Sequence, residues 1–552
     1  ADFLARKGVT HVFGVQGAHI LHLIDSLSRH PKLKFVPCGH EQGAAFAADA
    51  YARVTRKVGV ALSTSGPGAV NLLSGACSAY FDGIPVLFLT GQVASGQLKS
   101  PLVALRQLGF QETPVVGVFS HVTKVAWTVR HAYLVPDLLS DAWHYARQHR
   151  RGPVLLDLPD DIQRADINPE NEHLEPEDKI QPVDNLNDLL SCTAAAERPL
   201  VILGAGVWHS HTVDMARAFV EALGWPVLLS WGGMDLLPWD HPQNMGGFGT
   251  CGPLTGNLAL LNADFVLALG TRLNPQMVPD PSILKGKLAI VDIDANELVR
   301  FADAVTIHAH LRDFFLVMAD MKLPKWDFSA WLAQIQAWRQ LRPITGAKDW
   351  DPNPYAFLRA LSDASEETDI VLTDAGATLA WVMQTWHKKG VQRIISSWNH
   401  SPMGWALPAS MGAAFAGLGR RVICVTGDGS FNMNAQELGV LAKHNLWLKV
   451  FVMDNQGYGI IRQTQDMWLE RRHFASTKEE LGLPDIEALA LAYGVPALIL
   501  TGPDDWKLLP ELYLWRKSGP AIFRVLIDPK ARIDHKTGRS KDLDKVEICA
   551  SA

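Results

Sequence analysis

The sequence predicts an α/β protein built from three doubly wound parallel-sheet domains. Short apolar runs rich in β-branched residues alternate with helical stretches, as at residues 58–66, 84–91 and 421–429. Most of these runs end in Gly, Asp, Ser or Thr, where a loop leads into the next helix. Buried strands that alternate with helices are typical of parallel sheets. Such a fold places ligands in the loops at the carboxyl ends of the strands.

Length and polar interruptions divide the chain into three units. The chain has 552 residues, and domains of roughly 100–200 residues suggest about three of them. We interpret two polar stretches, at residues 166–186 and 341–354, as linkers. We therefore expect units at residues 1–165, 187–340 and 355–530, followed by a charged tail at 531–552.

Composition excludes several classes of protein. The net charge of −6 gives no electrostatic reason to bind nucleic acid or an anionic membrane. No apolar run is long enough to span a bilayer. The six cysteines are scattered and form no CxxC pair, which argues against a zinc site or a disulfide framework and predicts a cytoplasmic protein.

Two strand ends in the last unit predict a metal and diphosphate site. One strand runs into Gly427-Asp428-Gly429-Ser430, with a helix expected from about Asn434, and the strand at 448–454 ends beside Asn455 and Gly457. Residues 430 to 453 leave 24 positions (453 − 430 + 1), enough for one helix and one returning strand. One carboxylate and one amide oxygen suit Mg²⁺, and glycines at a helix N-terminus allow close approach of a diphosphate. The alternative is an ordinary Gly-Asp turn.

Glu41 is the candidate acid of the first unit. It follows the strand at 34–39 and opens a helix of small residues, GAAFAADAYAR. Such a helix can pack tightly and leave the acid poorly solvated, which favours its protonated form. A protonated acid can share a proton with a ring nitrogen. The alternative is an acid placed at a helix N-terminus by the macrodipole.

The spacing from GDG to Asp454-Asn455 resembles the cofactor signature of thiamine-diphosphate enzymes. The resemblance implies that Asp428 and Asn455 bind the metal with the carbonyl group of Gly457. It also implies that Glu41 contacts the aminopyrimidine ring of the cofactor and helps to deprotonate the thiazolium carbon. That family builds its site between a pyrimidine-binding and a pyrophosphate-binding domain of different subunits, so a homodimer or homotetramer is expected.

Within this class the chain is most similar to acetohydroxyacid (acetolactate) synthases. The matching segments are HEQGAAFAADAYARVT, STSGPGAVNLLSG with Asn71, RQLGFQETPVV with Phe110 and Gln111, and NHSPMGWALPASMGAAFA with Met403. The resemblance implies that Phe110 and Gln111 lie near the substrate and that Met403 holds the cofactor in its bent shape. The expected reaction is decarboxylation of pyruvate or a similar 2-keto acid, with transfer of the two-carbon unit to an acceptor carbonyl.

Three departures from the family pattern leave the acceptor open. The glycine-rich loop of the family reads Gln16-Gly17-Ala18-His19-Ile20 here, with His22 after it, and these histidines are candidates to position an acceptor or relay protons. Ile460 and Thr464 replace a Met and a Trp, and Gln276 replaces an acceptor-binding arginine. The alternatives are acetyl transfer to a keto-sugar nucleotide, a simple decarboxylase or dione hydrolase, and a non-catalytic homologue, which the presence of Glu41 and Asp428 disfavours.

The middle unit contains segments that relatives use to bind FAD or an ADP moiety. These are LGAG (203–206), GTRLN (270–274) and VDIDANEL (291–298). Glycine-ended strands and an acid after a strand are common in any α/β domain. The candidate ligands of the nucleotide are Gly204, Gly206, Arg272, Asp292 and Asp294.

Overall fold

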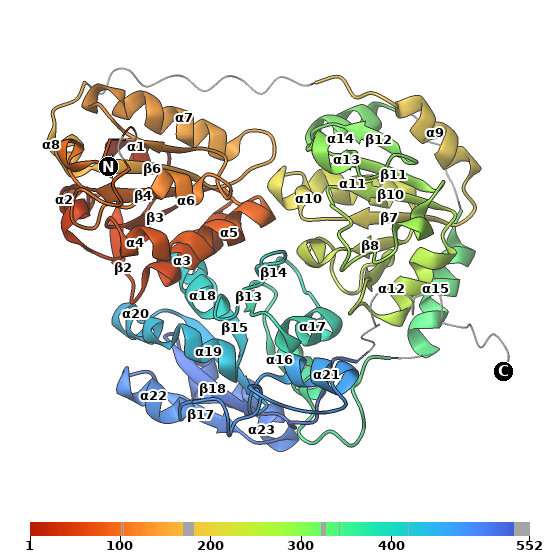
Figure 1. The fold of residues 1–552 in the computed structure, drawn as a ribbon. Coiled ribbons are helices and arrows are strands. Elements are labelled where there is room, and N and C mark those ends of the chain that lie inside the picture. The colour runs from red at the N-terminus through yellow and green to blue at the C-terminus, as the bar shows by residue number, and fades with distance from the viewer. Residues whose placement is uncertain are drawn as a thin grey trace.

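The computed structural model shows three lobes, each with its own parallel sheet (Figure 1). It describes residues 1–100, 102, 104–168, 181–321, 327–341, 343–417 and 419–534. Most of the first predicted linker (169–180) and most of the predicted tail (535–552) therefore lie outside the described residues. No helix in the described ranges is long and apolar enough to cross a membrane.

The first sheet has the strand order β2-β1-β3-β4-β6-β5. Its strands are β1 (His11–Gly14), β2 (Lys34–Pro37), β3 (Gly59–Ser63), β4 (Val86–Gln92), β5 (Ala126–Thr128) and β6 (Val154–Pro159). The helices of this lobe are α1 (Asp2–Arg6), α2 (Leu21–Arg29), α3 (Glu41–Thr55), α4 (Pro67–Asn71), α5 (Leu73–Asp82), α6 (Val115–Phe119), α7 (Val135–Arg147) and α8 (Asp160–Arg164), with 3-10 turns η1 (Ala18–Ile20), η2 (Ser95–Gln97) and η3 (Ala132–Leu134).

The third sheet repeats that order as β14-β13-β15-β16-β18-β17. Its strands are β13 (Ile370–Thr373), β14 (Arg393–Ile395), β15 (Val422–Gly427), β16 (Leu448–Asp454), β17 (Ala497–Leu500) and β18 (Ala521–Leu526). Its helices are α16 (Pro354–Ala364), α17 (Ala377–Thr385), α18 (Ala406–Phe415), α19 (Asp428–Met433), α20 (Leu438–His444), α21 (Gly459–Trp468), α22 (Ile486–Ala492), α23 (Pro503–Lys507) and α24 (Tyr513–Arg516), with 3-10 turns η7 (Ala435–Glu437) and η8 (Leu509–Glu511).

The middle sheet differs, with the order β12-β11-β10-β7-β8-β9. Numbered within the sheet this is 3-2-1-4-5-6 read from β9, the order of dinucleotide-binding folds, with the switch point between β7 and β10. The strands are β7 (Pro199–Leu203), β8 (Val227–Leu229), β9 (Asn244–Gly247), β10 (Phe265–Leu269), β11 (Leu288–Asp292) and β12 (Val305–His308). The helices are α9 (Leu186–Ala195), α10 (Gly206–His209), α11 (Val213–Leu223), α12 (Leu254–Asn262), α13 (Ala295–Leu298), α14 (Leu311–Asp320) and α15 (Ser329–Leu341), with 3-10 turns η5 (Trp231–Gly233) and η6 (Pro281–Leu284).

The structure confirms the predicted fold class of three parallel α/β sheets and adds one short helix to the predicted elements. Every strand pairing in the three sheets is parallel. The helix expected from about Asn434 is present as η7 (Ala435–Glu437) followed by α20 (Leu438–His444), and the short helix α19 (Asp428–Met433) precedes it. Asp428 lies in the first turn of α19, where the partial positive charge of the helix N-terminus stabilises an acid.

Close packing of α3 on α18 joins the first lobe to the third (Figure 1). Both helices are lined by small buried residues, mostly Ala and Gly. A Cβ atom on Gly412 would lie 2.0 Å from the carbonyl oxygen of Ala47, so the two backbones meet directly. Only glycine at this position allows that approach.

A buried ionic network reinforces the same junction. The guanidinium group of Arg53, near the end of α3, donates to both carboxylate oxygens of Asp49, at 3.0 and 3.2 Å, and to Asp82 at 2.8 Å. Arg53 also donates to the carbonyl oxygen of Ser396 in the third lobe, at 3.0 Å. Asp82 accepts the backbone N–H groups of residues 398 and 399. These contacts hold the first and third lobes together through groups removed from water.

We expect Arg53→Ala to lower the free energy of unfolding by about 3–5 kcal/mol, because two buried carboxylates would lose their cation. Chemical denaturation followed by tryptophan fluorescence measures the change. Arg29→Ala is the matched control, since Arg29 forms an exposed i,i+4 pair with Asp25 at 2.6 Å. That variant should stay within about 0.5 kcal/mol of the wild type. Equal effects of the two variants would contradict the proposed importance of the network.

Candidate active site

Glu41 is the first residue of α3, and its carboxyl group is nearly buried. Only 8% of Glu41 is exposed, and its Oε2 accepts a hydrogen bond from Nδ2 of Asn71 at 3.0 Å. The helix starts here because Nδ1 of His40 caps it, accepting from the N–H group of Gln42 at 3.1 Å. A Cβ atom on Gly68 would lie 3.1 Å from Oε1 of Glu41, so this glycine keeps the loop close to the acid.

A polar atom without a partner lies beside Glu41. Oγ1 of Thr64 is buried and has no hydrogen-bond partner within the described part of the chain. It belongs to the loop that also carries Gly68, whose added Cβ would meet the Thr64 methyl group at 2.9 Å. Buried polar groups are almost always hydrogen-bonded in native proteins. An unsatisfied hydroxyl at this position is therefore suited to a polar ligand.

The two candidate histidines point to different neighbours. Nδ1 of His19 lies 2.7 Å from Oγ of Ser65, in the loop next to Glu41. Nε2 of His22 lies 3.8 Å from Oδ1 of Asp160, at the start of α8. His19 therefore joins the loop that approaches Glu41, whereas His22 is directed towards an acid outside it.

The Phe110–Gln111 segment lies against the same loop. A Cβ atom on Gly66 would lie 2.8 Å from the carbonyl oxygen of Gln111, and Gln111 has a left-handed backbone with φ of 65°. Phe110 is 81% exposed. Glu112 stabilises the segment because its carboxylate accepts the N–H groups of Lys99 at 2.8 Å and Leu108 at 2.7 Å.

The second group of candidates lies at the carboxyl edge of the third sheet. Strands β15 and β16 are parallel neighbours, with Gly427 opposite Met453. Asp428 follows β15, and its Oδ2 accepts the N–H group of Gly457 at 2.8 Å, beyond the end of β16. Asn455 is 5% exposed, and a Cβ atom on Gly459 would lie 2.2 Å from its Nδ2. The structure thus brings Asp428 together with the Asn455–Gly457 turn.

A buried carboxylate and a left-handed glycine mark this edge. Burial raises the pKa of Asp428 to about 7, since desolvation opposes its charged form. Gly457 has φ of 125°, a conformation that other residues rarely adopt. Arg462 fixes the turn by donating to the carbonyl oxygens of Asn455 and Gln456, each at 2.8 Å.

Asp454, which stands where the family signature has its first asparagine, lies beside Asp428 and pairs with an arginine. Its Oδ2 pairs with Arg524 at 2.7 Å, and its Oδ1 accepts the N–H group of Gln456 at 3.0 Å. Arg524 also pairs with Glu487 at 3.1 Å. The charge of Asp454 is therefore compensated inside the domain.

The remaining candidates of the third lobe surround Gly429. A Cβ atom on Gly429 would lie 2.2 Å from the ring of Tyr458 and 3.4 Å from Cε of Met403. Ser430 is 5% exposed, in the first turn of α19. Any side chain at position 429 would therefore collide with the ring of Tyr458.

The middle lobe carries a crevice of about 970 Å³ at its switch point. Gly206, Arg272 and Asp292 line it. Gly204 does not line it but packs beside the end of the neighbouring strand β10, since a Cβ atom added to it would lie 2.2 Å from the carbonyl oxygen of Gly270. Residues of the first lobe (His144 and 147–151) and of the third lobe (398–399) also line the crevice. A ligand in it would contact all three lobes.

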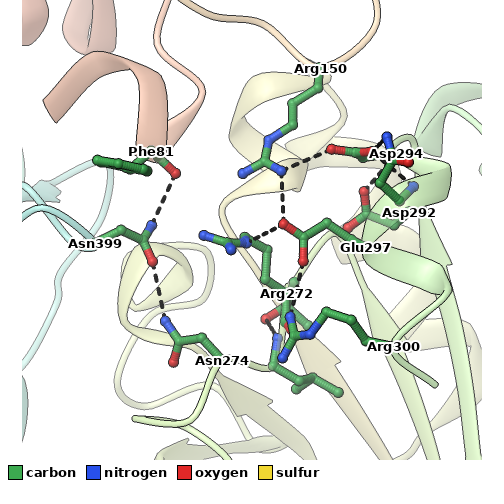
Figure 2. Close-up of polar contacts among 12 residues, drawn as sticks. Phe81, Arg150, Arg272, Asn274, Asp292, Asp294, Glu297, Arg300 and Asn399 are labelled. Atoms are coloured by element: carbon green, nitrogen blue, oxygen red, sulfur yellow. Dashed lines mark hydrogen bonds and ion pairs between the residues drawn. The ribbon is translucent and has the colours of Figure 1, made fainter. Parts of the chain in front are cut away.

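Glu297 is the centre of an ionic network at this crevice (Figure 2). Its carboxylate accepts from Arg272 at 2.6 Å, from Arg150 at 2.9 Å and from Arg300 at 3.0 Å. Arg150 comes from the first lobe and also pairs with Asp294 at 2.9 Å. Two of the predicted nucleotide ligands, Arg272 and Asp294, are thus engaged in one network.

Several of these residues did not stand out in the sequence. Thr64 and Ser65 lie inside the STSGPG segment, and Glu297 lies inside VDIDANEL, so position within a motif was the available signal. Arg150 gave no signal, because its partners are more than 140 positions away in another lobe.

Family models place the chain among the thiamine pyrophosphate enzymes. The N-terminal thiamine pyrophosphate binding domain matches residues 1–117, the central domain 186–316, and the C-terminal thiamine pyrophosphate binding domain 374–525. The chain is therefore a thiamine pyrophosphate-dependent enzyme.

Whole-chain relatives narrow that class. The chain is 31% identical to the acetolactate synthase large subunit of Lactococcus lactis subsp. lactis over 96% of this chain and 92% of the relative. It is 32% identical to the acetolactate synthase isozyme 2 large subunit of Escherichia coli K12 over 95% of this chain and 94% of the relative. The chain belongs to the acetolactate synthase family of thiamine pyrophosphate enzymes.

Proposed function

We propose that the protein decarboxylates pyruvate or a similar 2-keto acid and transfers the two-carbon unit to an acceptor carbonyl, as an acetolactate synthase does. The observation that carries the proposal is the buried carboxyl group of Glu41, held by Asn71 in a chain that also presents Asp428 and Asn455 at a sheet edge. Family membership over nearly the whole chain supports it.

The residues present fit a diphosphate-bound Mg²⁺. Asp428 offers a buried carboxylate, Asn455 an amide oxygen and Gly457 a carbonyl oxygen, and Mg²⁺ prefers such oxygen ligands. No cluster of three or more His, Cys, Asp or Glu side chains forms a metal site within the described ranges, so this mixed oxygen set is the candidate. Gly427, Gly429 and Ser430, where β15 leads into α19, would face the diphosphate.

Thiamine diphosphate supplies a nucleophilic ring carbon and an electron sink for decarboxylation when it is bound. Glu41 would hold and move the proton at its carboxyl group, facing a ring nitrogen. Asn71 orients that carboxyl group through its hydrogen bond. Met403 would support the cofactor, and Phe110, Gln111 and His19 would line the substrate side, with His22 farther out because it faces Asp160.

A keto acid is the acceptor that the comparisons favour. The relatives above are named as acetolactate synthases, so transfer to a keto-sugar nucleotide, simple decarboxylation and dione hydrolysis are less supported. Gln276 is exposed and accepts from Thr250 at 2.8 Å, and Thr464 donates to the carbonyl oxygen of Ile460 at 2.9 Å. These side chains bear no positive charge, so the acceptor carboxylate would need another cation.

We propose that the middle crevice binds FAD or an ADP moiety. The 3-2-1-4-5-6 strand order, the crevice at its switch point and the arginines along its walls suit a diphosphate. Asp292 is buried at the end of β11 and accepts the N–H group of Asp294 at 2.9 Å. Gly206 at the start of α10 lets the backbone come close.

A homodimer or homotetramer in the cytoplasm is the proposed state. Large apolar side chains are exposed on both halves of the candidate site: Phe110 at 81%, Trp468 at 58%, Phe474 at 56% and Met433 at 47%. Exposed apolar patches mark interaction sites, and these side chains are candidates to form one. We expect two subunits to cover these side chains by joining the Glu41 half of one chain to the Asp428 half of another.

Glu41→Gln should slow turnover of pyruvate by about 10²–10⁴-fold, the usual contribution of a positioned acid or base, while folding is retained. Product analysis with pyruvate alone should show acetolactate in the wild type. Acetaldehyde alone would instead indicate a simple decarboxylase. Turnover of the variant at the wild-type rate would remove the proposed role of Glu41.

Asp428→Ala should abolish Mg²⁺-dependent binding of thiamine diphosphate, measured by quenching of tryptophan fluorescence. The affinity should fall by more than the roughly 10–100-fold that substitutions outside the first coordination sphere of a metal cost. Asp454→Asn is the matched control, because Arg524 keeps Glu487 as a partner. Loss of binding in the control but not in Asp428→Ala would reverse the assignment.

Mixing Glu41→Gln chains with Asp428→Ala chains should restore activity if two subunits share each site. Random pairing makes half of the dimers hybrid, and each hybrid has one intact site out of two, so about a quarter of the wild-type activity should return. Sites built within one chain would give no recovery.

The purified protein should carry FAD, visible by its flavin absorbance, or gain thermal stability on addition of FAD or ADP, because a ligand of the folded state raises its stability. Absence of both effects would contradict a nucleotide site in the middle lobe.

A further inference from the structure

Glu437 is a buried acid that holds the backbone immediately before Glu41. It ends the turn η7 in the third lobe and is fully buried, with 0% of its surface exposed. Its Oε2 accepts the N–H group of Gly39, and its Oε1 accepts that of His40, each at 3.1 Å. Among the described residues it forms no ion pair with Lys or Arg. The two oxygens of one carboxylate therefore bind the two residues that precede the candidate acid.

Two glycines make room for this contact. A Cβ atom on Gly43, in the first turn of α3, would lie 2.3 Å from Oε1 of Glu437. A Cβ atom on Gly39 would lie 2.8 Å from Cγ of Gln436. The start of α3 and the turn η7 thus interlock so closely that neither can shift without losing the hydrogen bonds. Asn434 adds a weaker contact, because its Nδ2 lies 3.3 Å from Oε1 of Gln42.

The contact requires the ionised form of Glu437. A carboxylate can accept both N–H groups, whereas a protonated carboxyl group must direct one O–H hydrogen away and loses an acceptor. Burial raises the pKa of Glu437 to about 7, against the opposing effect of the two N–H groups. The titratable residues nearest the contact along the preceding loop and the start of α3 are Cys38, His40 and Glu41, and α18 contains none. Burial, with a smaller contribution from Glu437, raises the pKa of the Cys38 thiol, so Cys38 stays neutral.

We propose that Glu437 is a positioning residue, which fixes the loop at Gly39 and His40 and thereby sets the place of the Glu41 carboxyl group against the cofactor ring. The proposal rests on the role proposed for Glu41. It assigns the third lobe a function in activating the cofactor that is separate from metal and diphosphate binding. The loop is clamped above a pH of about 7 and released as the pH falls through that value, because protonation of Glu437 removes an acceptor.

Hydrogen–deuterium exchange tests, without substrate, the hydrogen bonds from Gly39 and His40 to Glu437, which we call the clamp. In the protein free of cofactor, Glu437→Gln should speed amide exchange in a peptide covering residues 34–45, because an amide side chain can accept only one of the two N–H groups. Asp157→Asn is the matched control, since Asp157 is a buried acid of the first lobe with side-chain partners Thr90, Gln92 and Thr128. The control should leave exchange in that peptide unchanged. Unchanged exchange in Glu437→Gln would overturn the clamp.

The rate of proton exchange at the reactive carbon of bound thiamine diphosphate, followed by NMR, tests positioning. Glu437→Gln should slow it by about tenfold to 100-fold, the cost of a small misplacement of a catalytic group. The wild-type rate should fall as the pH is lowered through about 7, and the variant should lack that step. Glu437→Asp keeps a carboxylate, so it should retain the pH step and recover part of the rate. Gly43→Ala, which pushes the carboxylate away, should act like Glu437→Gln.

These outcomes separate the clamp from the proposed function. A wild-type protein that neither exchanges the cofactor proton nor turns over pyruvate contradicts the proposed function. A wild-type protein that does both, beside a Glu437→Gln variant with the same rate and pH profile, overturns the positioning role alone. If Glu437→Gln fails to fold, the exchange rates and pH profiles of Glu437→Asp and Gly43→Ala decide instead. Wild-type rates and pH profiles in both of these variants would also overturn the positioning role.

Discussion

The close packing of α3 on α18 is the constraint on which the rest of the structure depends. Gly412 approaches the backbone of Ala47 so tightly that any side chain there would force the helices apart. Because α3 is held at this distance along its length, its two ends acquire fixed positions as well. Glu41 begins the helix, and Arg53 near its end joins Asp49, Asp82 and the third lobe. A single helix of small residues therefore sets both the place of the candidate acid and the junction of two lobes.

The first and third sheets share one strand order, and this repetition explains how the two halves of the candidate site arise. In each sheet the polar residues follow the carboxyl ends of central strands, as Thr64 follows β3 and Asp428 follows β15. Parallel strands always present these ends at one edge. The first lobe supplies an acid and hydroxyl groups, and the third supplies a carboxylate and backbone oxygens. Two similar scaffolds thus offer complementary chemistry to the two ends of one elongated cofactor.

The sequence could predict those features that depend on local pattern. Apolar runs identified the central strands, and the parallel class followed from their alternation with helices. Short strands such as β5 and β14 were missed because three residues at a sheet edge carry little periodic signal. Glu41 and Asp428 stand at strand–helix transitions, where position alone suggests a site. Glu437 could not be recognised in this way, since its partners Gly39 and His40 lie almost 400 positions away. Its surroundings, a helical segment with other polar residues, are those of an ordinary surface acid.

In the middle lobe, two of the predicted nucleotide ligands belong to one ionic network. Arg272 and Asp294 were expected to face a nucleotide, yet Glu297 and Arg150 join them in one ionic network across two lobes (Figure 2). A phosphate group that approached Arg272 would compete with a carboxylate already 2.6 Å away. Binding would therefore be favourable only if the ligand replaced that contact or used the remaining walls of the crevice. In either case a ligand in the crevice would also meet Arg150 of the first lobe, which lines it.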